Sequence, residues 1–207
     1  MSQTDAAVSD AALHGHGALL EASPYGLPSR KFTMWLFIIS DAVTFGAFLF
    51  AYGYLRVATP NWTRPFETGS VINVIAMTVV LVTSSLTMLG AVDAAKLGDK
   101  GKAMRFLYST IVLGALFAAL HIREWFQLFG KGITISSGLF GQTFFMITGL
   151  HLLHVISGVI ALLVISSGFS RGRFSPSHVE TTGLYWHFVD LVWMFVVPLV
   201  YLTNIAR

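Results

Sequence analysis

Five long apolar segments alternate with short polar stretches along the chain. They run from about residue 32 to 57, 71 to 95, 106 to 129, 139 to 169 and 182 to 205. At about 1.5 Å per residue, each is long enough to cross a hydrocarbon core of about 30 Å as an α-helix. The pattern predicts an all-α polytopic membrane bundle of five transmembrane helices over residues 31–207.

The connections between these segments are short and rich in turn-forming residues, which leaves no room for a soluble domain. The turn formers are Pro60 and Pro65, Gly98 and Gly101, Gly130 and Gly132, and Gly172 and Pro176. Residues 1–30 are polar and rich in small residues, so we expect a mobile N-terminal tail. His14 and His16 in this tail form only a weak metal-binding pattern.

Composition supports a membrane protein and excludes several kinds of site. The chain is 55% hydrophobic and 11% charged, against about 25% charged residues in a soluble domain. It has no cysteine, which excludes disulfides, thiolate metal sites and cysteine nucleophiles. The net charge of +3 comes from basic residues in short loops, so it does not indicate nucleic-acid binding.

The basic residues are distributed unequally between the two ends of the predicted bundle. The larger group is Arg30, Lys31, Lys96, Lys100, Lys102, Arg105, Arg171 and Arg173, and the smaller group is Arg56, Arg64, Lys131 and Arg207. Because cytoplasmic loops carry the excess of Lys and Arg, we expect a cytoplasmic N-terminus and a C-terminus outside.

The last apolar segment carries the most informative polar residues. His187 and Asp190 lie one helical turn apart, and an aspartate at the centre of a membrane helix costs about 2.5 to 3.5 kcal/mol. Trp186, Asp190 and Trp193 share one face by their spacing. We therefore predict a packing face with polar content, and favour contacts between helices over direct chemistry.

The other spans add further buried acids and histidines. We predict a network of Asp41, His121, Glu124, His151, His154, His187 and Asp190. Within it, Asp41 lies at the depth of Asp190 and is expected to be neutral, hydrogen-bonded to Ser40, His187 or a backbone carbonyl. Glu124 is expected to contact His121, three residues earlier. Outside the network, Asp93 is expected to pair with Lys96.

Two other functional classes remain as alternatives. His121 and His151, on neighbouring spans at similar depth, are candidates for axial haem ligands in a membrane anchor. A small transporter also needs membrane acids, but is expected to have repeats or broken helices, and Pro198 is the one proline within a predicted span. Since no phosphate-binding glycine loop or serine–histidine–carboxylate pattern occurs, we predict no catalytic and no metal site in the chain.

Four motifs together resemble subunit III of the haem-copper terminal oxidases. They are FIISD at residues 37–41, Glu124-Trp125, GLHLLHVISG at 149–158 and YWHFVD at 185–190, followed by Trp193. They occur in the family's order, and the resemblance covers nearly all of the chain from Lys31 onward. Five spans resemble the shorter form of the family, which lacks the first two helices of its longer members.

The resemblance implies a non-redox subunit of a proton-pumping oxidase in a bacterial inner membrane. Haem and copper are then expected in partner subunits I and II, with none in this chain. Phospholipids are expected partners, and further small subunits or a respiratory supercomplex are additional ones. The family's roles are assembly, lipid binding and sustained proton uptake, and its electron donor is either cytochrome c or a quinol.

The resemblance and the positions of the basic residues also suggest two specific sites. Asp41 matches a position that is commonly a glutamate in the family, the membrane carboxyl that reacts with carbodiimides. Arg123, with Arg56 and Trp62 near the same predicted outer interface, is expected to hold a phospholipid headgroup.

Overall fold

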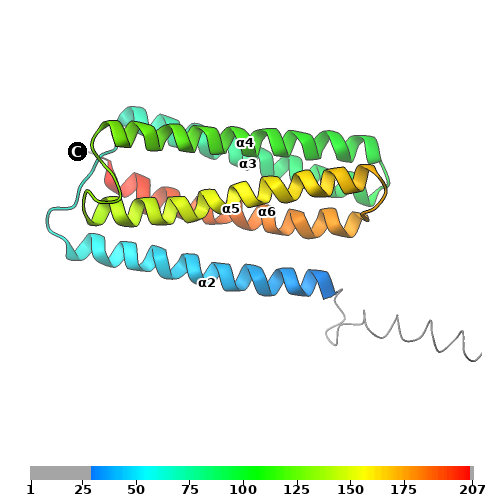
Figure 1. Ribbon diagram of the computed structural model, residues 1–207, viewed down its shortest axis with the longest axis horizontal. Helices are drawn as coiled ribbons and strands as arrows, with labels where there is room; N and C mark the ends of the chain where they lie inside the picture. The colour runs from blue at the N-terminus through cyan, green and yellow to red at the C-terminus, as the bar shows by residue number, and fades with distance from the viewer. Residues whose placement is uncertain (1–28, 206–207) are drawn as a thin grey trace, which may run out of the picture.

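The computed structural model describes residues 29–205 and forms an up-and-down bundle of long helices (Figure 1). The helices are α2 (Ser29–Ala58), α3 (Thr68–Lys96), α4 (Lys100–Gly130), α5 (Leu139–Ser170) and α6 (Pro176–Val196). Within residues 29–205, five helices are long and apolar enough to span a membrane, which confirms the predicted all-α bundle of five spans. The first described helix already contains Ser29 and Arg30, assigned above to the tail; His14 and His16 lie outside the described residues.

The last helix changes from the α-helical hydrogen-bond repeat to other helical repeats near its end. After Val196 the chain continues as a π-helical segment, Val197–Tyr201, and a short 3₁₀ segment, Leu202–Asn204. Pro198 has no backbone N–H to donate, so it removes a bond of the α-helical ladder where the wider repeat begins. The change turns Tyr201 and Asn204 into the protein, where they are 2% and 0% exposed.

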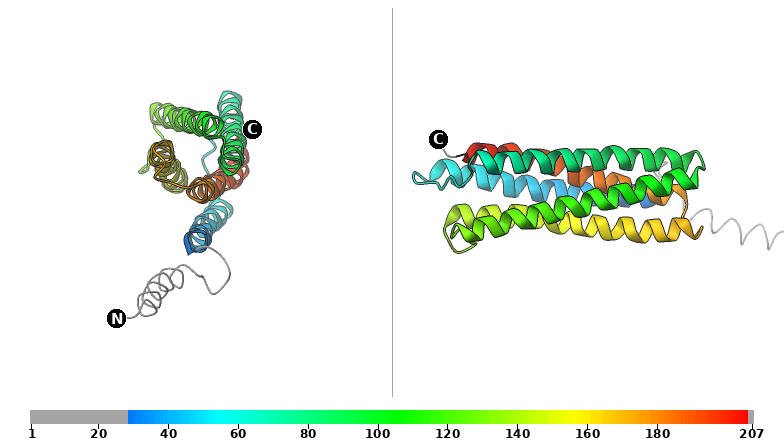
Figure 2. Two further views of the ribbon diagram at one scale, coloured as in Figure 1. Left: turned by 90° about the vertical axis from the view of Figure 1, so that its right-hand side faces the viewer. Right: turned by 90° about the horizontal axis from the view of Figure 1, so that it is seen from above.

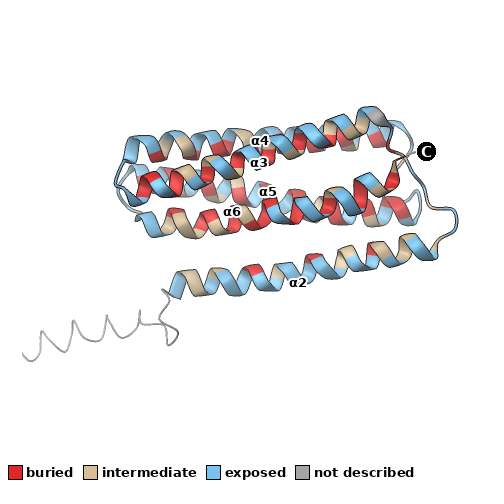
Figure 3. Ribbon diagram, turned by 180° about the vertical axis from the view of Figure 1, so that it is seen from behind, coloured by how far each residue is buried: buried red, intermediate tan, exposed pale blue. Residues whose placement is uncertain are grey.

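Helices α3 to α6 form a four-helix unit, and α2 lies against its outside (Figure 2). The main neighbours of α2 are α6 and α5. The buried residues of α2 are Ile38, Phe45 and Tyr52, a single stripe with a spacing of seven, whereas α3 to α6 bury much more of their surface (Figure 3). Helix α2 is therefore held by one narrow face.

The bundle has two ends, an N-side end and a C-side end. The N-side end holds the start of α2 and the α3–α4 and α5–α6 turns, and the C-side end holds the α2–α3 and α4–α5 connections and Asn204. At the N-side end, Gly98 and Gly172 adopt φ values of +78° and +70°, which a residue with a Cβ rarely adopts. The N–H of Lys102 donates to Asp99 Oδ1 at 2.9 Å and caps the start of α4.

Ion pairs link helices at both ends. On the N-side, Glu180 of α6 accepts from Lys31 of α2 at 3.0 Å and from Lys96 of α3 at 3.2 Å. The predicted pairing of Lys96 with Asp93 was therefore wrong, because the lysine reaches across to α6 while Asp93 stays exposed. On the C-side, Lys131 pairs with Glu67 at 2.9 Å.

Trp186 fills the middle of the four-helix unit and is fully buried. Its indole N–H donates to Ser84 Oγ of α3 at 3.0 Å. Its ring lies against two glycines of other helices: a Cβ on Gly114 of α4 would come within 2.5 Å of the ring, and a Cβ on Gly158 of α5 within 2.9 Å. A single side chain thus joins α6 to the three other helices of the unit.

We expect Gly158→Ala to lower the thermal stability of the folded chain by about 1–3 kcal/mol, because the added methyl group overpacks against Trp186. Gly46→Ala is the matched control, since a Cβ there has nothing within 4 Å. Equal midpoints of thermal unfolding for the two variants in the same detergent would contradict this packing.

Candidate functional site

Helices α2 and α5 are joined by a polar pair between Asp41 and His154, both of which are partly buried. Asp41 Oδ2 lies 2.9 Å from His154 Nε2, and the two side chains are 18% and 15% exposed. His154 Nδ1 lies 2.7 Å from the carbonyl oxygen of Leu150 and so carries the hydrogen that it donates. The contact with Asp41 then needs one shared proton, so the pair has no net charge whichever atom holds it.

This pairing corrects the expected partners of Asp41, which were Ser40, His187 or a backbone carbonyl. The sequence allows an estimate of depth along a helix, but it does not say in which direction a side chain points around the helix. Asp41 faces α5. His187 turns to α3 instead, where its Nδ1 lies 2.5 Å from Ser85 Oγ.

Trp186, Asp190 and Trp193 form the predicted buried face of α6, with exposed fractions of 0%, 7% and 0%. The indole N–H of Trp193 donates to Thr78 Oγ1 of α3 at 3.1 Å. Neither carboxyl oxygen of Asp190 has a hydrogen-bond partner among the described residues. The hydroxyl groups Thr78, Ser84 and Ser85 of α3 thus form a polar seam with α6 that sequence reasoning missed.

His121 of α4 and His151 of α5 are completely buried beside Trp193. Their ring centroids lie 5.4 and 5.1 Å from the Trp193 ring, and each lies 5.8 Å from the Phe117 ring. None of their ring nitrogens has a hydrogen-bond partner among the described residues. Aromatic rings of Trp193 and Phe117 therefore pack beside both histidines.

Glu124 of α4 is 2% exposed and accepts a hydrogen bond from Tyr201 at 2.9 Å. The expected contact with His121 was wrong, because the π-helical end of α6 brings the Tyr201 hydroxyl to the carboxyl group. Tyr201 was not predicted as a site residue. Pro198 was the one signal in the sequence for this change of repeat.

Asn204 joins three parts of the C-side end. Its Oδ1 accepts from Trp62 Nε1 at 2.9 Å and from Arg56 Nε at 3.3 Å, and its Nδ2 donates to the Tyr52 hydroxyl. Arg56 also donates to the carbonyl oxygen of Thr203 at 2.6 Å. The two residues expected to hold lipid together with Arg123 therefore bind protein groups at the end of α6.

Arg123 lies apart from Arg56 and Trp62, on the other side of the bundle. It lines a groove of about 540 Å³ between α3 and α4 at the C-side end. It makes no hydrogen bond or ion pair with any of residues 29–205. The structure thus separates the three residues of the predicted lipid site into two places.

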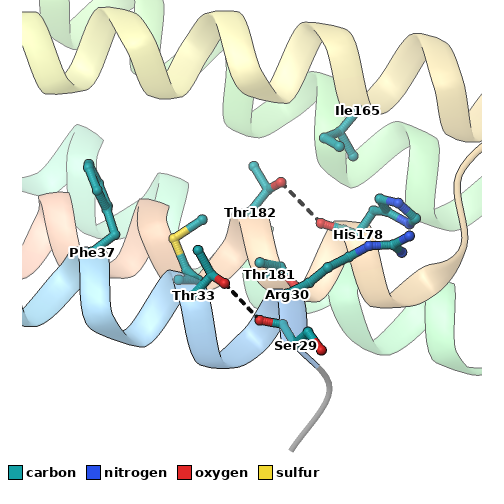
Figure 4. Close-up of a pocket in the computed structure, with 9 residues that line it drawn as sticks. Ser29, Arg30, Thr33, Phe37, Ile165, His178, Thr181 and Thr182 are labelled. Carbon is teal, nitrogen blue, oxygen red and sulfur yellow. Dashed lines mark hydrogen bonds between the residues drawn. The ribbon is translucent and has the colours of Figure 1, made fainter. Parts of the chain in front are cut away.

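A second pocket, of about 510 Å³, opens at the N-side end between α2, α5 and α6 (Figure 4). Arg30 and His178 extend toward its mouth, and Met34, Phe37 and Ile165 line its apolar part. The hydroxyl of Thr33, which also lines this pocket, donates to a backbone carbonyl of its own helix at 2.9 Å. The pocket combines a cationic mouth with an apolar floor.

Among residues 29–205, no three His, Asp or Glu side chains lie close enough together to hold a metal ion. The arrangement instead joins polar side chains of different helices in pairs. Such contacts set which helices are neighbours and how they are rotated. This is the geometry of a polytopic membrane protein in which some acids and histidines, among them Asp41, Glu124 and His154, join helices through hydrogen bonds.

The comparisons agree with the motifs. The family model described as cytochrome c oxidase subunit III matches residues 7–204, so this chain belongs to the cytochrome c oxidase subunit III family. The match begins well before Lys31 and includes most of the segment that the resemblance had left out. It confirms membership of the subunit III family of haem-copper oxidases.

Relatives from different organisms match most of the chain. Cytochrome c oxidase subunit 3 of Corynebacterium diphtheriae is 33% identical over 75% of this chain and 80% of that protein. Cytochrome bo(3) ubiquinol oxidase subunit 3 of Pseudomonas aeruginosa is 32% identical over 83% of each chain. Heme-copper oxidase subunit I+III of Aeropyrum pernix is 30% identical over 88% of this chain, which spans 24% of that longer protein.

We expect Asp41→Asn to assemble normally and to begin oxygen reduction at close to the normal rate. The asparagine amide can still donate to His154 Nε2, while the carboxyl that we expect to react with a hydrophobic carbodiimide is lost. Asp93→Asn, at an exposed carboxyl, is the control and should keep the label. Complete loss of oxygen reduction in a fully assembled Asp41→Asn complex would show that the group is catalytic.

We expect Tyr201→Phe to destabilise the fold by about 1–3 kcal/mol, because Glu124 loses its hydroxyl donor inside the protein. Tyr54→Phe removes a hydroxyl from a side chain that is 66% exposed, and should have little effect. Thermal unfolding of both variants provides the measurement. Two equal midpoints would show that the Tyr201–Glu124 bond contributes nothing.

Proposed function

We propose that this chain is a non-redox supporting subunit of a terminal oxidase in a bacterial inner membrane. Its partners are the oxidase subunits I and II, which carry the haem and copper. The observation that carries the proposal is the pairing of polar side chains of different helices within the spans, with Asp41 bound to His154 and Glu124 bound to Tyr201. These groups stabilise a scaffold and leave oxygen chemistry to the partners.

The names of the relatives support partners of this kind. In the Aeropyrum pernix protein, a subunit I+III, the matching segment belongs to one longer chain. A segment that can be fused to subunit I is expected to lie beside it when it is a separate chain. Because cytochrome c oxidase and ubiquinol oxidase subunits match with nearly equal identity, the proposal concerns the role shared by both kinds of oxidase.

The proposed role also includes two further tasks. The chain supports sustained proton uptake, and it binds phospholipid. The N-side pocket has the combination that a phospholipid needs, with Arg30 at the mouth and Phe37 in the apolar part. The exposed hydrophobic residues of α2, which include Ile39 at 56% and Phe50 at 78%, offer surface to lipid or to a partner subunit. Proton uptake itself is assigned to subunit I.

The haem-anchor alternative depends on His121 and His151. Both rings pack against Trp193 and Phe117, which favours aromatic packing over axial ligation of a haem as their role. The transporter alternative is favoured by one feature, the interruption of the α-helical repeat at the end of α6 near Pro198. Family membership outweighs that single feature.

Assembly provides the test. Gentle detergent extraction of a tagged chain from its native membrane should recover one complex that contains haem and copper proteins in fixed proportion. The purified single chain should show no haem Soret band and no stoichiometric copper. Recovery of a lone chain from the native membrane, or a Soret band in the single chain, would contradict the proposal.

A further inference from the structure

We propose that the groove between the C-side ends of α3 and α4 binds one glycerophospholipid, with its phosphate held by Arg123. This inference refines the lipid-binding part of the proposed function, on which it rests. It places the lipid in the leaflet that the distribution of basic residues predicts to be the outer one. It also separates this site from Arg56 and Trp62, which bind protein groups.

The first observation is a set of hydrogen-bond donors with nothing to bind. The side chains of Arg123 and Gln127 lie on one face of α4 by their spacing of four, and Ser70 faces the same groove from α3. No side-chain hydrogen bond joins any of the three to another of residues 29–205. The donors suit the oxygens of a phosphodiester and the ester groups beside it.

The second observation is the charge of the groove. Glu67 also lines it, but this carboxylate is paired with Lys131 at 2.9 Å. The hydrogen bond and the positive charge of Lys131 lower the pKa of Glu67, so the pair stays charged at neutral pH. Arg123 is then the uncompensated charge among the described lining residues, and a phosphodiester carries the single negative charge that matches it.

The third observation is the order of polar and apolar residues along the groove. Ser70 and Gln127 lie near the ends of their helices, whereas Ala76 and Leu120 line the part nearer the middle of the bundle. Arg123 is seven residues before the end of α4 at Gly130, or about 10 Å along the helix. A headgroup at the helix ends with an acyl chain over Ala76 and Leu120 follows this order.

Depth explains why a lipid phosphate fits Arg123 better than water or a free ion. A guanidinium two turns inside a membrane helix is costly unless it reaches the interface or an anion reaches it. The neighbouring surface is apolar, with Ile72 65% exposed and Phe126 68% exposed. An amphipathic anion satisfies the charge and covers the apolar surface together.

Photolabelling in nanodiscs tests the site directly. The detergent-extracted protein with its native partners is placed in nanodiscs of phosphatidylcholine containing a small fraction of a diazirine-labelled phosphatidylglycerol, and labelled peptides are mapped by mass spectrometry. We expect labelling of α4 near Arg123 that falls about tenfold in Arg123→Gln. Arg105→Gln removes a charge from the other end of the same helix and should leave this labelling unchanged.

Ala76→Phe provides a second variant that does not alter charge. It fills the apolar part of the groove and should reduce labelling near Arg123 while the guanidinium is retained. Inorganic phosphate, compared with chloride at equal ionic strength, should not compete. Labelling that is equal in wild type, Arg123→Gln and Ala76→Phe, or abolished by inorganic phosphate, overturns the site. A cross-link from Arg123 to a carboxylate of a protein partner overturns it as well.

The same preparation keeps this inference distinct from the proposed function. If haem proteins copurify but labelling does not depend on Arg123, only the lipid site is refuted. Labelling that depends on Arg123 in a chain that brings no haem proteins would refute the oxidase role and leave the lipid site standing.

Discussion

The contact between α3 and α6 is the constraint on which the rest of the bundle depends. Inside a bilayer, helices gain little from hydrophobic burial against one another, so close packing and hydrogen bonds must hold them together. Here α6 supplies two buried indoles, and each donates to a hydroxyl of α3: Trp186 to Ser84 and Trp193 to Thr78. The two bonds fix both the register and the rotation of α6 relative to α3.

The other helices are placed by the same two indoles. Trp186 fits where glycines of α4 and α5 leave room, and Trp193 lies beside His121 of α4 and His151 of α5. Helix α2 is attached to this unit by one narrow stripe and by polar contacts, of which Asp41–His154 lies nearest the middle of the helix. A few specific contacts thus hold the helix whose remaining surface faces lipid or a partner.

The polar residues fit a supporting role for the chain within an oxidase. Buried groups that bond each other raise the specificity of helix pairing, and a bundle built this way offers its neighbours a fixed surface. Arg30 and Arg123 have no hydrogen-bond or ion-pair partner among residues 29–205, and each lines a groove that also has apolar lining residues. Interior pairs and surface grooves therefore suggest two separate tasks, which are scaffold and lipid contact.

The spans and the buried face of α6 could be predicted from the sequence because both depend on local periodicity. The pairing of Asp41 with His154 could not, since depth along a helix does not say which neighbour a side chain faces. Tyr201 was missed because the π-helical segment changes the direction of every side chain after Pro198. Arg56 and Arg123 were grouped by depth, although the fold places them on different sides of the bundle.

The most direct measurement compares stability with initial turnover when the seam between α3 and α6 is weakened. A complex with both Thr78→Val and Ser84→Ala loses the two hydroxyl acceptors of the indoles. The account predicts that this subunit dissociates at a lower temperature while the initial rate of oxygen consumption per haem is unchanged. An unchanged dissociation temperature with a reduced initial rate would contradict it, because the seam would then serve the chemistry and not the scaffold.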